Sequence, residues 1–194
     1  MDRLIIKKIV IVGIFVFLVL FTAVGCNSKK EVVNKTKKEN ATSLVLYFSA
    51  TGTTKKIAER IASKSGSDII EIIPKEKYTS ADLDYNKDCR ANREQNDDKA
   101  RPEIENKIDI DKYETIYLGY PIWWGTNPKI ILTLLDTYDF SDKKIIPFCT
   151  SGSSGIGESV DALRKYNSKL NIKAGKRFSA SDDDKVVEEF LNNN

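Results

Sequence analysis

Short apolar runs alternate with helical patterns along the chain from residue 43 onward. The apolar runs are typical of strands buried on both faces of a sheet, and they occupy residues 44–48, 68–73, 115–120, 144–149 and 174–180. Between them, apolar side chains recur every three or four residues, which predicts helices over 53–65, 128–138, 156–163 and 183–191. Strands that alternate with helices run parallel. The pattern therefore predicts an α/β domain with an open five-stranded parallel sheet and helices on both faces.

Two features do not fit a simple alternation. Pro147 lies inside the fourth predicted strand, where it removes a hydrogen-bond donor from the ladder. Residues 75–112 are too many for an ordinary connection and are strongly polar, with one weak helical pattern over 81–100. Segments of this length are commonly lids or binding loops, and disorder is the other interpretation.

The N-terminal region has the order of a secretory signal, with a basic start, an apolar run and small residues before Cys26. Ala-Val-Gly-Cys at 23–26 resembles the cleavage box of bacterial lipoproteins, and the resemblance implies that Cys26 is lipidated. The alternative is an uncleaved anchor, but the apolar run is shorter than the ~20 residues of a typical spanning helix. The polar residues that follow predict a flexible tether. We therefore expect an exported protein at the outer face of the cytoplasmic membrane, with a signal peptide over 1–25, a lipidated Cys and tether over 26–42 and a folded domain over 43–194.

Charge and composition exclude several classes of function. Residues 1–42 hold eight of the 31 basic and three of the 28 acidic residues, so the stretch from Ser43 onward has a net charge of −2. Such a domain has no basic field for a phosphate backbone, and we expect no nucleic-acid partner. The chain has no His and no C-x-x-C pair, so common zinc sites and His-dependent triads are not expected. Cys149 ends an apolar run and is expected to be a buried structural thiol.

The segment between the first strand and the first helix is the strongest candidate for a binding loop. It reads Ser49-Ala50-Thr51-Gly52-Thr53-Thr54. A helix start offers unpaired N–H groups and the positive end of the helix dipole, Gly52 allows close approach, and the hydroxyls add donors. This loop suits a terminal phosphate, and an ordinary threonine-rich N-cap is the alternative. Neither a Walker loop nor a dinucleotide fingerprint fits, because each needs more glycines than this segment has.

Three loops together resemble those of the flavodoxin-like superfamily. Ser49, Thr51, Gly52 and Thr54 match its phosphate loop, [ST]-x-T-G-x-T. The second loop, which includes Pro121, Ile122, Trp123, Trp124 and Gly125, is similar to the loop beside the flavin ring. The third, with Thr150, Ser151, Gly152, Gly155 and Gly157, is similar to the glycine-rich segment at the ring edge. The resemblance implies the strand order 2-1-3-4-5 and an FMN cofactor held by these residues together with Thr53.

The resemblance leaves the use of the flavin open. An electron carrier for an unknown redox partner is one interpretation, an FMN-dependent NAD(P)H:quinone-type reductase acting on a small acceptor is another, and a flavin-free surface binding protein is a third. The third loop has no aromatic residue to cover the second ring face, so a side chain of the long excursion is a candidate cover: Tyr78, Tyr85 or Arg90. We expect one of the two tryptophans at the ring and the other in the core.

Overall fold

The computed structural model describes residues 41–194. The expected signal peptide, the candidate lipidation site Cys26 and nearly all of the expected tether lie outside this range. Among the described residues, every helix is too short or too polar to cross a bilayer.

One parallel sheet forms the centre of the described domain. Its strands are β1 (Ser43–Tyr47), β2 (Asp68–Glu71), β3 (Thr115–Pro121), β4 (Lys144–Thr150), β5 (Asn171–Ile172) and β6 (Lys176–Phe178). The order is β2-β1-β3-β4-β5, β6 also pairs with β4, and every pair is parallel. The predicted fold class and strand order are confirmed. Because β1 lies between β2 and β3, the order reverses beside β1, where open sheets of this kind bind ligands.

The last strand differs from the prediction because it starts earlier and is divided in two. Ile145 is paired with Ile172, and Phe148 is paired with Lys176. Between these two pairs β4 has residues 146–147 and the edge strand has residues 173–175, so the edge strand contains one extra residue. The carbonyl of Ile145 accepts from the N–H of Lys173, and alternation along a strand turns the nitrogen of Pro147 toward the same edge. Pro147 has no hydrogen to donate there. The interruption in the edge strand therefore accommodates the proline that sequence reasoning could not place.

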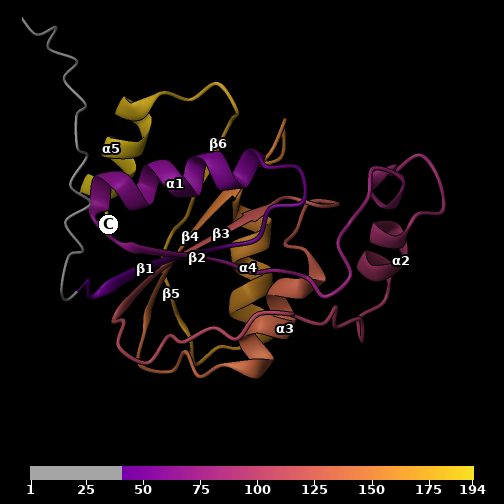
Figure 1. Cartoon of the computed structure of the whole chain (residues 1–194), viewed down its shortest axis with the longest axis horizontal. Coiled ribbons are helices and arrows are strands. Elements are labelled where there is room, and N and C mark those ends of the chain that lie inside the picture. The colour runs from indigo at the N-terminus through magenta and orange to yellow at the C-terminus, as the bar shows by residue number, and fades with distance from the viewer. Residues whose placement is uncertain (1–40) are drawn as a thin grey trace, which may run out of the picture. The chain divides into compact units, whose positions relative to one another are not determined.

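Two helix layers cover the sheet (Figure 1). Helices α1 (Thr53–Ser65) and α5 (Asp184–Asn192) pack on one face, and α3 (Lys129–Thr137) and α4 (Gly157–Tyr166) on the other. Successive strand residues point to opposite faces. Hence Val45 and Tyr47 join the core under α1 and α5, while Leu44 and Leu46 join the core under α3 and α4.

The long polar excursion is folded and closed at its base. Pro74 and Ile104 form an antiparallel bridge, with Lys75 N–H donating to Glu103 O at 2.9 Å and Glu105 N–H to Ile73 O at 2.8 Å. The weak helical pattern over 81–100 yields only a 3-10 turn, η1 (Ala81–Leu83), and a short helix, α2 (Arg90–Asn96), because a polar turn separates them. Helix α2 belongs to neither helix layer (Figure 1).

Candidate functional site

The loop between β1 and α1 has the backbone of an anion site. Gly52 is the N-cap of α1 with φ 85°, and no side chain caps this helix end. Its N–H donates to Ser49 Oγ at 3.1 Å, and the first helical bond runs from Lys56 N–H to Gly52 O. The N–H groups of the first turn therefore have no acceptor within the helix. They are available to an anion at this point.

The second loop is a tight hairpin turn that presents Trp124. Trp123 and Thr126 exchange two backbone hydrogen bonds of 2.9 and 3.0 Å. Trp124 and Gly125, the two central residues, have φ of 47° and 80°. This is the left-handed turn that normally takes Asn-Gly. A bulky residue with positive φ is a costly exception, and such exceptions cluster at ligand sites.

Hydrogen bonds join the three loops to one another. The buried Thr54 hydroxyl lies 2.7 Å from the hydroxyl of Thr150, which links the first loop to the third. Ile122 N–H donates to Thr150 O at 3.0 Å, which links the second loop to the third. The three loops therefore form one connected rim at the carboxyl ends of β1, β3 and β4.

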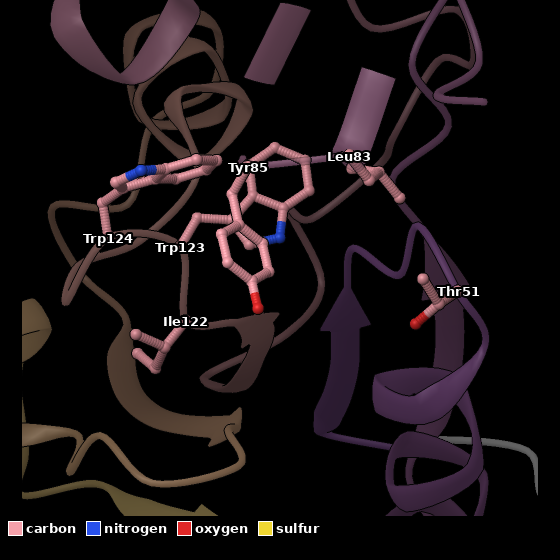
Figure 2. A pocket seen from close by; sticks show the side chains of 6 residues that line it. All are labelled: Thr51, Leu83, Tyr85, Ile122, Trp123 and Trp124. Carbon is pink, nitrogen blue, oxygen red and sulfur yellow. The ribbon is translucent and has the colours of Figure 1, made fainter. Parts of the chain in front are cut away.

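Two hollows of different character lie within this rim. One, of about 300 Å³, is lined mainly by small and hydroxyl-bearing residues: Thr51, Thr53, Pro121, Ile122, Thr150, Ser151, Gly152, Ser179 and Ala180. The other, of about 410 Å³, is apolar in most of its lining: Thr51, Leu83, Tyr85, Ile122, Trp123 and Trp124 (Figure 2). Thr51 and Ile122 line both hollows. The site thus offers a polar compartment beside an aromatic one.

The structure brings most, but not all, of the predicted site residues to these two hollows. Ser49, Gly52 and Thr54 shape the first loop without lining either hollow. Gly155 and Gly157 line a separate depression with Glu158. Gly125 lies next to this depression, since a Cβ built on it would be 3.1 Å from Glu158 Oε2.

Sequence reasoning missed several lining residues. Ser179 and Ala180 line the polar hollow because they follow β6 at the same end of the sheet as the three loops. The sequence did offer a signal for these two residues, because they come at the end of a strand and one of them is a serine. Leu83 had no signal, because the path of the excursion is not encoded in any local pattern.

The excursion contributes one of its three candidate residues to the apolar hollow. Tyr85 lines it and is 71% exposed. Tyr78 instead packs edge-on against Trp123 and Phe48, with ring centroids 5.0 and 5.8 Å apart. Arg90 lies over the Tyr78 ring at 4.3 Å and pairs with Glu94. Tyr78 and Arg90 therefore hold the excursion in place.

The two tryptophans share the apolar hollow but differ in their surroundings. Trp123 packs against Phe48 and Tyr78, so it belongs to the hollow and to the edge of the core at once. Trp124 is 47% exposed.

Cys149 is fully buried, and burial raises the pKa of its thiol to about 12, so it is a neutral structural side chain at pH 7.

A family model described as flavodoxin matches residues 42–194. No curated protein matches the chain. The chain is similar to solved structures of two candidate flavoproteins. One, from Bacteroides eggerthii, has 42% identity and a TM-score of 0.75 over 79% of this chain and 97% of that one. The other, from Bacteroides uniformis, has 37% identity and a TM-score of 0.76 over 79% and 99%.

A third similar structure was solved with a ligand. It is a flavoprotein from Lactobacillus acidophilus in complex with FMN, with 29% identity and a TM-score of 0.62 over 78% of this chain and 99% of that one.

Proposed function

This chain belongs to the flavodoxin family, and we propose that it binds FMN and transfers electrons to a redox partner at the outer face of the cell membrane. The observation that carries the proposal is the pair of adjoining hollows, one polar and one aromatic. FMN has the same division, with a phosphate and a hydroxylated chain at one end and a flat ring at the other. The volumes lie in the range of small-molecule sites, about 300–1,000 Å³.

The residues present fit this cofactor. The N–H groups at the start of α1, with the hydroxyls of Thr51 and Thr53, would hold the phosphate. Trp123 and Trp124 would give the ring an apolar wall and exclude water from it. When bound, FMN supplies reversible one- or two-electron transfer, while the protein supplies position and polarity. The complex of a similar protein with FMN supports this assignment.

The absorbance spectrum of the domain over 43–194, purified and saturated with FMN, tests the cofactor. We expect flavin bands that remain with the protein after desalting, and FMN released on denaturation. Binding of FAD in its place would contradict the assignment. A folded protein that ignores FMN would contradict it as well and would favour a flavin-free binding function on the same fold.

An FMN-dependent reductase is the second candidate function. It is favoured by the openness of the apolar hollow, because Tyr85 and Trp124 are the most and second most exposed large hydrophobic side chains of the described residues. Stepwise reduction separates the two functions. A carrier takes up electrons singly from a chemical reductant, whereas a reductase is reduced in two-electron steps by NADH or NADPH and then passes them to a quinone.

We also propose that the domain is exported and anchored through Cys26. Support comes from the order of basic, apolar and small residues before this cysteine. In cells fed a labelled fatty acid, the wild-type protein is expected to carry label and to pellet with membranes. The variant Cys26→Ser should lose the label. Label that persists in this variant would contradict lipidation at Cys26.

A further inference from the structure

Besides Thr51, two chain segments line the apolar hollow, and helix α2 holds both of them. Those segments are 83–85, in the excursion, and 122–124, in the second loop. On one side, the amide nitrogen of Asn92 donates to the carbonyls of Tyr85, at 3.2 Å, and Lys87. On the other side, the amide nitrogen of Gln95 donates to the carbonyl of Trp123 at 3.2 Å.

Gln95 makes three contacts with the second loop and the helix that follows it. Besides the bond to Trp123, its amide nitrogen lies 3.4 Å from Asn127 O, and its carbonyl accepts from Lys129 N–H at 3.2 Å. Lys129 begins α3, so one of the free N–H groups of that helix is satisfied by a side chain of α2. The amide nitrogen and the amide oxygen of Gln95 therefore both hold the residues that flank the turn at Trp124.

Asn92 and Gln95 are three residues apart, so they lie close together on the surface of α2. The helix itself is held by Arg90, whose guanidinium pairs with Glu94 at 2.6 Å and covers Tyr78. Tyr78 in turn packs on Trp123 and donates to Glu94. One short helix thus connects the Tyr85 segment to the Trp123 turn through side-chain amides and an aromatic contact.

We propose that α2 is a strut that sets the relative position of the two lining segments, with Asn92 and Gln95 as positioning residues for a planar aromatic ring in the apolar hollow. The ring is that of FMN, so this inference rests on the proposed function for the identity of its ligand. The mechanical coupling of the two segments does not depend on that identity. Neither residue lines the hollow, and each acts through the backbone that it holds.

Ligand binding gives the first test. Gln95→Met keeps the size of the side chain and removes all three hydrogen bonds, and Gln95→Glu keeps an acceptor for Lys129 while losing the donor to Trp123. Fluorescence titration with FMN is expected to show an affinity roughly 10-fold lower for Gln95→Met. The loss for Gln95→Glu should be at least as large, because a carboxylate oxygen then faces the carbonyls of Trp123 and Asn127. The visible circular dichroism of bound flavin should change, since the wall beside the ring has moved.

Asn106 offers a matched control. It too is an amide that holds backbone, donating to Glu71 O at 2.8 Å and accepting from Ile73 N–H at 2.9 Å, but at the base of the excursion, outside both lining segments. Asn106→Leu should lower stability while leaving FMN affinity and the flavin spectrum unchanged. If Gln95→Met and Asn92→Ala also bind FMN as the wild type does, with the same spectrum, the strut is refuted.

Hydrogen exchange in the FMN-free protein tests the coupling by itself. Asn92→Ala removes bonds to residues 85 and 87 only, yet a strut predicts faster exchange at the amides of Trp123 and Thr126 as well. Acceleration confined to residues 83–88 would overturn the inference. A wild-type protein that fails to bind FMN would refute the proposed function, and the exchange data would still decide whether α2 couples the two segments.

Discussion

Replacing Phe148 by alanine is expected to lower the free energy of unfolding by about 3–5 kcal/mol, the usual cost of truncating a fully buried aromatic side chain. Phe148 is in the middle of β4 with no exposed surface, and its ring packs edge-on against Phe178 and Phe190 at centroid distances of 6.3 and 6.4 Å. The ring is part of the core that joins the sheet to α1 and α5. Urea denaturation followed by far-UV circular dichroism measures the loss.

Gly119 sharpens this prediction because it lies directly against the same ring. A Cβ on Gly119 would approach the Phe148 ring to between 2.2 and 2.8 Å, which no real contact allows. Gly119→Ala alone should therefore cost about 1–3 kcal/mol through overpacking. In the double variant, the added methyl group enters the space that Phe148→Ala vacates. The double variant should therefore lose less free energy of unfolding than the sum of the losses in the two single variants. Strict additivity would show that the two sites relax independently and would contradict this packing.

The sequence predicts the fold and the position of the three loops, because each follows from the alternation of strands and helices. Each predicted loop comes directly after a strand, and parallel strands end at one edge of the sheet. Thr51, Ile122 and Thr150 are therefore expected to lie close together, and all three line the polar hollow. Periodicity gives the alternation of strands and helices, whereas the strand order that brings the three loops together is implied by the resemblance to the flavodoxin-like superfamily.

The excursion was not predictable in the same way. Its polar residues have no strong period, and its conformation depends on distant partners such as Tyr78 on Trp123 and Gln95 on the second loop. The contribution of Leu83 to the apolar hollow follows from those contacts. Gly155 and Gly157, which the resemblance places at the ring edge, line a depression separate from the two hollows, and their contact with the cofactor stays a prediction.

The phosphate loop is expected to make the protein discriminate strongly between FMN and riboflavin, which lacks the phosphate. Hydrogen bonds to a charged group each contribute about 1.5–3 kcal/mol, so two or three of them at the start of α1 predict an affinity for FMN roughly 10³-fold higher. Titration of the domain with each compound, at the same ionic strength, measures the ratio. Equal affinities would place the phosphate elsewhere.

Gly52 tests whether the backbone of this loop produces the discrimination. It has φ 85° but open space around its Cα, so Gly52→Ala strains the backbone without causing a clash. This strain should lower the free energy of unfolding by roughly 1–2 kcal/mol. Because the loop backbone then relaxes and its N–H groups change direction, we expect weaker binding of FMN with little change in the binding of riboflavin. Gly66 is the matched control, since it has φ 67° at the other end of α1. Gly66→Ala should cost similar stability and leave the FMN to riboflavin ratio intact. A ratio that falls equally in both variants would mean that lost stability, and not loop geometry, weakens binding.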